Sequence, residues 1–286
     1  MNPHSDTLTT ADGRTALRMR RRLAHPPQRV WESITRPAHL AHWFPSEVTV
    51  DLRPGGKIGF LFPGEQEPGM SGTVTDLDEP HVFAFQWDED HLRWEITPEG
   101  DSGSLLTLTH TFGDRFGGAS FASGWHLCLT ALAQLLDGES VDVDPDGGEL
   151  HEAYLEQFDL GRGTVLDDGI RFERQLVRPT AAVWAELAAG TAPSAGGPVP
   201  AGFTVEPFAD GRVTEVREAE LLEYAWDLKG AEGAEGRIRW EFGQGTGHGP
   251  RLVLTQTGLY GSARQEALDA WHTHLERLAA RLLEMS

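Results

Sequence analysis

Three residues of the sequence could carry acid–base chemistry together. Arg93 and Glu95 flank Trp94 on a predicted strand, and His110 lies on the strand that follows. A carboxylate beside a guanidinium could polarise a ketone and take a proton from it, as aldol cyclisation requires, and an imidazole could act as the base. If Trp94 points inward, however, the two charges point outward and form a cross-strand ladder, which is the arrangement we favour.

Other chemical signatures are incomplete. Ser71 lacks the spacing of a nucleophile elbow, and the glycine-rich stretch 243–249 misses both phosphate-loop patterns. His39 and His42 could share a helix face, but the sequence supplies no third ligand beside them. We therefore expect neither a metal ion nor a cofactor.

The chain carries the same pattern twice. Residues 92–95 read Leu-Arg-Trp-Glu, and residues 238–241 read Ile-Arg-Trp-Glu, an offset of 146 (238−92). Trp125 and Trp271 are separated by the same offset (271−125). A period of this length indicates a duplicated domain rather than a short solenoid repeat. We place the boundary near residue 163, which gives domains 1–163 and 164–286.

The elements that would position these residues recur in the same order in both copies. A strand comes first, then two short helices in the first copy but one helix and a loop (190–202) in the second. A meander of alternating strands follows, and an amphipathic helix closes each copy, at 119–136 and at 266–285. In the second copy we expect a strand near 203–208. The order predicts an α+β fold in which a curved antiparallel sheet packs its concave face on the long helix and leaves a space between them.

Composition narrows the class of protein. Apolar residues make up 39% and charged residues 24% of the chain, as in soluble globular proteins. A net charge of −20 argues against nucleic-acid binding. The sequence contains no run of 18 apolar residues, so we expect no membrane-spanning helix. The polar start of the chain lacks a secretory signal, and Cys128 is the single cysteine, so we expect a cytoplasmic protein.

Aromatic residues are abundant and gather on the predicted strands and closing helices. Most would pack in the core, but some are candidates for the wall of a ligand pocket, because aromatic side chains offer large apolar areas. His110 and Gln256 occupy equivalent positions (256−110 is 146) and could orient a ligand. The remaining candidate wall residues are Trp43, Phe60, Phe62, Phe85, Trp87, Trp94 and Trp125 in the first copy and Phe208, Trp226, Trp240 and Trp271 in the second.

The first copy resembles the SRPBCC superfamily, whose fold is the START/Bet v 1-like helix grip, and within it the homologues of the heat-shock-protein-90 ATPase activator. The second copy retains fewer of the matching motifs. The resemblance rests on Pro27-x-x-Val30-Trp31, Pro37-Ala38-His39-Leu40-Ala41-His42-Trp43-Phe44, Gly55-Gly56-Lys57, Gly72-Thr73-Val74, Phe85-Gln86-Trp87 and Gly124-Trp125.

Such a resemblance implies a cavity for a hydrophobic or amphipathic small molecule, but not a reaction. Our leading hypothesis is the binding of an aromatic, polyketide-like or enediyne-like natural product, in its biosynthesis or in self-resistance to it. The alternatives are a polyketide aromatase/cyclase and a protein-binding module similar to a chaperone co-factor. Neither nucleic acid nor membrane is expected as a partner, and the oligomeric state is left open.

Overall fold

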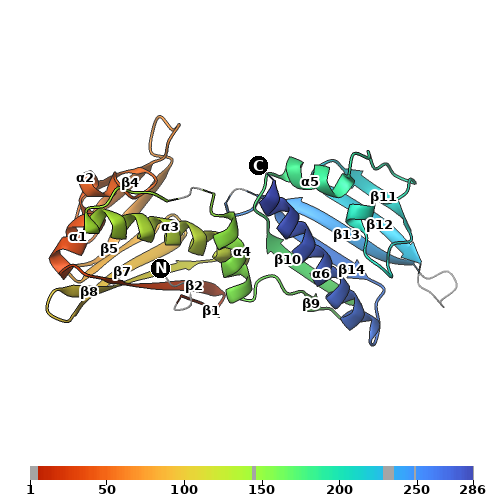
Figure 1. Cartoon of the computed structure of the whole chain (residues 1–286), viewed down its shortest axis with the longest axis horizontal. Coiled ribbons are helices and arrows are strands. Elements are labelled where there is room, and N and C mark those ends of the chain that lie inside the picture. Colours follow the sequence, from red (N-terminus) through yellow and green to blue (C-terminus); the bar gives the residue numbers. More distant parts are fainter. Residues whose placement is uncertain (1–5, 144–145, 228–234, 248, 286) are drawn as a thin grey trace. The chain divides into compact units, whose positions relative to one another are not determined.

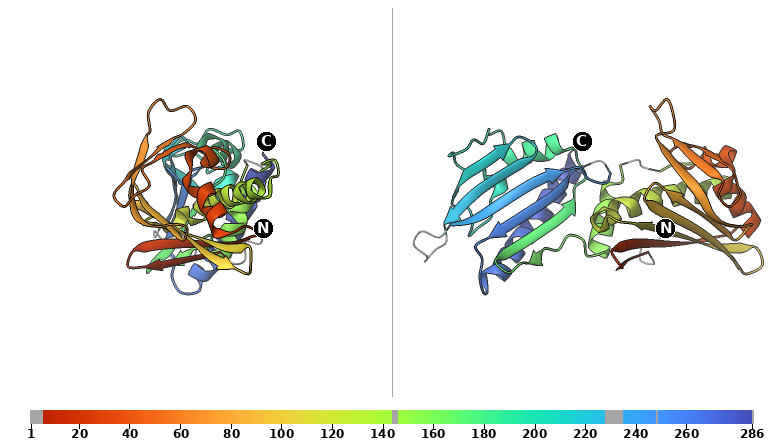
Figure 2. Two further views of the ribbon diagram at one scale, coloured as in Figure 1. Left: turned by 90° about the vertical axis from the view of Figure 1, so that its left-hand side faces the viewer. Right: turned by 180° about the vertical axis from the view of Figure 1, so that it is seen from behind.

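The computed structural model describes residues 6–143, 146–227, 235–247 and 249–285 (Figure 1). The chain divides into two compact units, Met1–Gly147 and Gly148–Ser286. In each unit a long helix crosses one face of an antiparallel sheet, and the right-hand view of Figure 2 shows the second unit's sheet in front of its helix. The predicted α+β fold of two tandem helix-grip domains is therefore confirmed.

The first unit contains an eight-stranded sheet in the order β1-β2-β8-β7-β6-β5-β4-β3, and every neighbouring pair is antiparallel. Most of its strands follow one another as a meander, so the register is set by short hairpin turns. The strands are β1 (Thr7–Ala11), β2 (Arg14–Leu23), β3 (Glu47–Val50), β4 (Lys57–Leu61), β5 (Met70–Asp78), β6 (Val82–Trp87), β7 (Asp90–Glu99) and β8 (Gly103–Phe112).

Three helices of the first unit are placed by local signals in the sequence. The helices α1 (Pro27–Thr35) and α2 (Pro37–Leu40) each begin with a proline, which fits the first helical position because no backbone donor is needed there. A 3-10 turn at Arg115–Gly117 leads into the long helix α3 (Gly118–Asp137). This helix ends at Gly138, whose φ of 75° is the left-handed conformation that glycine adopts without strain.

The second unit contains a six-stranded antiparallel sheet in the order β11-β12-β13-β14-β10-β9. Its long helix α6 (Ala263–Glu284) corresponds to α3, and α5 (Thr180–Ala188) corresponds to α1. A further helix, α4 (Gly148–Gln157), comes first in this unit. The strands are β9 (Thr164–Val165), β10 (Gly169–Gln175), β11 (Gly211–Arg217), β12 (Leu221–Asp227), β13 (Glu235–Gly243) and β14 (Arg251–Thr257).

The division between the units falls earlier than the boundary predicted at residue 163, because α4 belongs with the second unit. Glu152 on α4 forms an ion pair with Arg174 on β10, with 2.6 Å between the carboxylate and guanidinium atoms. Arg174 is almost fully buried and also contacts Glu276 on α6. These charges therefore attach α4 to the second sheet and its closing helix.

The segment between α5 and β11 differs from its counterpart in the first unit. Where the first unit has β3 and β4, the second has a 3-10 turn at Ala201–Phe203 and no strand among residues 189–210. The strand expected near 203–208 is therefore wrong, because Phe203 and Phe208 turn inward and are buried in the core instead of alternating along an extended chain. We call residues 201–208 the plug segment.

No helix in the described part of the chain is long and apolar enough to cross a membrane.

Candidate functional site

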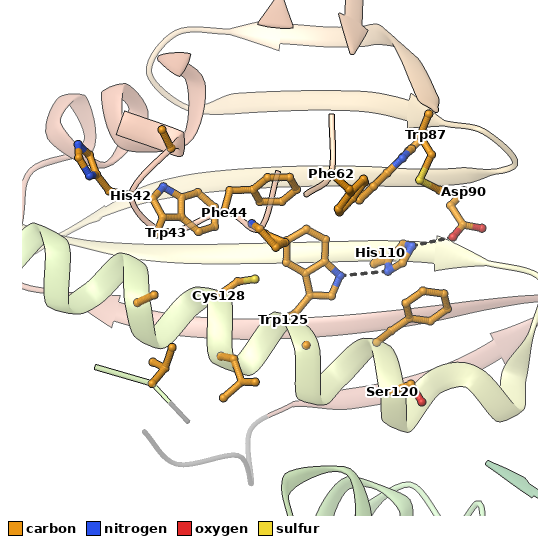
Figure 3. Close-up of a pocket in the computed structure, with 18 of the residues that line it drawn as sticks. His42, Trp43, Phe44, Phe62, Trp87, Asp90, His110, Ser120, Trp125 and Cys128 are labelled. Atoms are coloured by element: carbon orange, nitrogen blue, oxygen red, sulfur yellow. Dashed lines mark hydrogen bonds and ion pairs between the residues drawn. The ribbon is translucent and has the colours of Figure 1, made fainter. Parts of the chain in front are cut away.

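A cavity of about 780 Å³ lies in the first unit beside α3 (Figure 3). Its lining comes from one side of α3, the segment that follows α2, the turn between β6 and β7, and the chain just after α3. Ligand pockets of proteins typically measure about 300–1,000 Å³, so this cavity has room for a drug-sized molecule.

Six phenylalanine and tryptophan side chains lie in the wall. Figure 3 shows Trp43, Phe44, Phe62, Trp87 and Trp125 along the length of the cavity. The ring of Phe44 lies 6.0 Å from that of Trp125, and Phe62 stacks on Trp87 with 6.4 Å between their centres. Trp43 is fixed by a hydrogen bond of 2.9 Å that its indole N–H donates to the carbonyl of Ser33. The wall is therefore a preformed apolar surface rather than a set of mobile side chains.

Three predicted wall residues lie one layer deeper. Phe60, Phe85 and Trp94 are buried behind the lining rather than in contact with the main cavity. Phe60 stacks on Trp87 at 4.5 Å, and Trp94 meets Trp125 edge-on at 5.5 Å. Their part in the site is to hold Trp87 and Trp125 in position.

His110 does line the cavity, and it is the middle of a hydrogen-bonded chain. The indole N–H of Trp125 donates to Nδ1 of His110 over 3.2 Å, and Nε2 of His110 lies 3.0 Å from Oδ2 of Asp90. Because an indole nitrogen only donates, Nδ1 must accept, and the network assigns the proton to Nε2, which donates to Asp90. Both ring nitrogens are thus engaged, and neither offers a lone pair to a molecule in the cavity.

Arg93 and Glu95 point away from the cavity. Their neighbours Leu92, Trp94 and Ile96 are buried, so the alternation of the strand turns the two charged residues to the outer face. There Arg93 pairs with Asp76 at 2.8 Å and with Glu95 at 3.3 Å. Those partners raise the pKa of Arg93, and hydrogen bonding to Arg93 lowers the pKa of Asp76. Trp94 therefore points inward, as we expected, and Arg93 and Glu95 have no access to a ligand in the cavity.

Sequence reasoning missed several lining residues, although signals for them exist. Asp90 shares the inward parity of Leu92 and Trp94, since positions two apart on a strand face the same way. Phe121 and Cys128 are spaced four before and three after Trp125, so a helix brings them to one side. Burial raises the pKa of the Cys128 thiol to about 12. The thiol is therefore uncharged at neutral pH.

Beneath α6, buried aromatic side chains fill the corresponding space in the described part of the second unit. Trp226 is the counterpart of Trp87, and its cross-strand partner is Gly236, whereas Trp87 pairs with Asp90. A Cβ at position 236 would collide with the indole of Trp226 and with the carbonyl of Thr257, so the glycine lets the tryptophan lie across the strand. Phe208 packs on the same indole at 5.0 Å.

The plug segment is held from several sides. The hydroxyl of Tyr224 and the indole of Trp240 both donate to the carbonyl of Phe203, over 3.1 and 3.2 Å. The Phe203 ring lies 5.4 Å from that of Trp240. Trp271 donates to Oε1 of Gln256 over 2.6 Å, which reproduces the Trp125–His110 contact with an amide. The five candidates of the second copy, Phe208, Trp226, Trp240, Gln256 and Trp271, are therefore buried core residues.

Among the residues that the structure describes, no group of three histidine, cysteine or acidic side chains is arranged to hold a metal ion. The candidate site is accordingly an apolar cavity with one polar end.

Comparison with known proteins agrees with this architecture. A family model described as "Activator of Hsp90 ATPase homolog 1-like protein" matches residues 24–137 and 189–283. No curated protein sequence matches the chain significantly.

Solved structures with a similar fold cover one unit or both. A conserved protein of unknown function from Enterococcus faecalis is 22% identical over 55% of this chain and 91% of its own, with a TM-score of 0.47. CalU16 from Micromonospora echinospora is 23% identical over 53% of this chain and 94% of its own, with a TM-score of 0.43. DynU16, described as a putative protein in the dynemicin biosynthetic locus, is 18% identical over 94% of this chain and 97% of its own, with a TM-score of 0.42.

Proposed function

Since the chain belongs to the family of Activator of Hsp90 ATPase homolog 1-like proteins, we propose that its first unit binds one hydrophobic, aromatic small molecule in the cavity beside α3. The observation that carries this proposal is the cavity of about 780 Å³ with its preformed aromatic wall. Aromatic walls with a few polar groups at one end are typical of sites that bury most of a small ligand.

The contrast between the two units supports one site per chain. In the first unit, Trp87 lies beside an open cavity. In the second unit, the equivalent Trp226 and the plug segment are part of a packed core. An empty apolar cavity costs packing energy, because its walls lose contacts that a filled core makes. The open cavity is therefore best explained by a ligand that occupies it.

Binding is favoured over catalysis by the state of the polar groups. His110 has both ring nitrogens in hydrogen bonds, and Arg93 and Glu95 face outward. An aromatase/cyclase would need one of these groups to reach the reacting carbon. A protein-binding module would need a contiguous exposed apolar patch, but Met70 and Val141, two exposed large hydrophobics of this unit, belong to the cavity lining.

The setting that we propose is the biosynthesis of an aromatic natural product, or self-resistance to it, which is what the resemblance of the sequence implies. A titration with N-phenyl-1-naphthylamine, a neutral dye that fluoresces in apolar surroundings, tests the binding itself. We expect saturable binding with one site per chain and quenching of tryptophan emission by energy transfer to the dye, because Trp87 and Trp125 line the cavity. A flat titration, or two equivalent sites per chain, would contradict the proposal.

A further inference from the structure

The charged residues of the cavity lining are unevenly distributed. Asp88 and Glu89 form the turn between β6 and β7, Asp90 is the first residue of β7, and all three contribute to the lining. Among the described residues, the lining contains no lysine and no arginine, and His42 lies at the opposite end from Asp90 (Figure 3). The cavity therefore has an apolar aromatic body and a negatively charged end.

Asp90 is held in a fixed position at that end. His110, whose side chain is only 3% exposed, donates to Oδ2 of Asp90, and Trp125 in turn fixes His110. The side chain of Asp90 keeps 28% of its surface accessible, and Oδ1 makes no hydrogen bond in the described part of the chain. A carboxylate that is oriented on one oxygen and accessible on the other is prepared to accept a hydrogen bond from a ligand.

Positive groups near this end do not cancel the negative charge. Arg14 is a cation near this end, and its guanidinium donates to the main-chain carbonyls of Glu89 and Thr111. The three carboxylates of the lining outnumber this guanidinium, and the chain as a whole carries a net charge of −20. Low-dielectric walls concentrate such a field inside a cleft, so cations are attracted to it and anions are repelled.

The rings around Asp90 suit the same kind of ligand. Trp87 pairs with Asp90 across the hairpin, and the Phe121 ring lies 4.5 Å from that of His110. Aromatic faces attract an ammonium group electrostatically, most strongly those of tryptophan. An ammonium ion at this end would thus meet a carboxylate and aromatic faces together.

On the basis of the binding function proposed above, we infer that the ligand is a cationic amphiphile: an aromatic or otherwise apolar body that carries a protonated amine, with the amine at Asp90. The apolar body lies against Trp43, Phe44 and Trp125, and the amine donates to Oδ1 of Asp90. This goes beyond a general hydrophobic pocket, because it assigns the sign of the ligand's charge and the end at which that charge binds.

Three compounds of nearly equal shape test the inference at pH 7 and low salt: 1-naphthylmethylamine, 1-naphthylmethanol and 1-naphthoate, each measured by displacement of N-phenyl-1-naphthylamine. We expect the amine to bind about tenfold more tightly than the alcohol and the carboxylate to bind most weakly, because a charge-assisted hydrogen bond adds to the shared apolar contact. Raising the salt concentration to 0.5 M should reduce the preference for the amine.

Variants locate the effect. Asp90→Asn should abolish the preference for the amine over the alcohol while the neutral dye still binds, and Asp88→Asn/Glu89→Gln should reduce it with the His110 hydrogen bond intact. Asp101→Asn, in the turn after β7, removes the same charge away from the cavity and should leave the preference unchanged.

Equal binding of amine and alcohol, or an unchanged preference in Asp90→Asn, would overturn the charge assignment alone. Failure of the dye and all three compounds to bind the wild-type chain would overturn the proposed function as well.

Discussion

Gly124 offers the most direct test of the cavity. It lies inside the helix α3 and lines the cavity, and a Cβ added there would meet no atom within 4 Å beyond its own helix neighbours. Glycine costs about 1 kcal/mol relative to alanine in a helix interior. Gly124→Ala should therefore raise the free energy of unfolding by about 1 kcal/mol, which is roughly 2–4 °C in the melting temperature of a domain of this size.

Gly124→Phe should separate folding from binding. The ring would project into the empty space, so we expect a melting temperature close to that of the wild type. The dye would have to displace or overpack this ring, at a cost of about 1–3 kcal/mol, which corresponds to roughly a fivefold to 150-fold loss of affinity. The position equivalent to Gly124 in the second unit is Ala270, since 270−124 is 146. Ala270→Phe is the matched control and should not alter dye binding.

Calorimetry of the whole chain and titration with N-phenyl-1-naphthylamine measure the two quantities. A lower melting temperature for Gly124→Ala would show that the space at this helix face is not open. Dye affinity of Gly124→Phe equal to that of the wild type would show that ligands bind elsewhere, and the assignment of the site would be refuted.

Three further results are expected. Cys128, with a thiol pKa of about 12, should react slowly with iodoacetamide at pH 7 and faster as the pH rises, because the thiolate is the reactive form. Alkylation should be slower when a ligand occupies the cavity, and mass spectrometry measures its extent. Burial alone would raise the pKa of Glu152, but hydrogen bonds and charges of His151 and Arg174 outweigh it and lower the pKa. The ion pair thus stabilises the fold above the ordinary pKa, and this stabilisation is lost as the pH falls through the lowered pKa. Urea unfolding of Glu152→Gln should therefore show a cost of about 2 kcal/mol at pH 7 that disappears once the pH is below the lowered pKa. Phe203→Ala should destabilise the second unit by about 3–5 kcal/mol, visible as a lower calorimetric transition, because a fully buried ring is removed.

Much of the architecture could be predicted from the sequence because it depends on local periodicity. The alternation around Trp94 set the inward face of β7, and prolines at 27 and 37 marked the beginnings of α1 and α2. The strand expected near 203–208 failed because tertiary contacts with Phe203 outweighed the local pattern.

The position of the cavity, in the first unit and not in the second, could not be predicted from local periodicity. Trp87 and Trp226 are equivalent in sequence, yet the first lines a cavity and the second fills one. What separates them is the residue across the hairpin, Asp90 or Gly236, and that partner acts only through side-chain packing. Phe60, Phe85 and Trp94 were assigned to the cavity wall for the same reason, since parity gives the face of a strand but not the depth of a side chain behind its neighbours.

The glycine at 236 also limits which substitutions the second unit tolerates. An aspartate at 236, as at the equivalent position 90, would drive its Cβ into the indole of Trp226, and Phe208 packs on that indole. Position 236 can therefore carry a side chain only if the indole of Trp226 moves, and Trp226 can move only if Phe208 gives way. The backbone of β13 and two aromatic side chains thus constrain one another in the second unit.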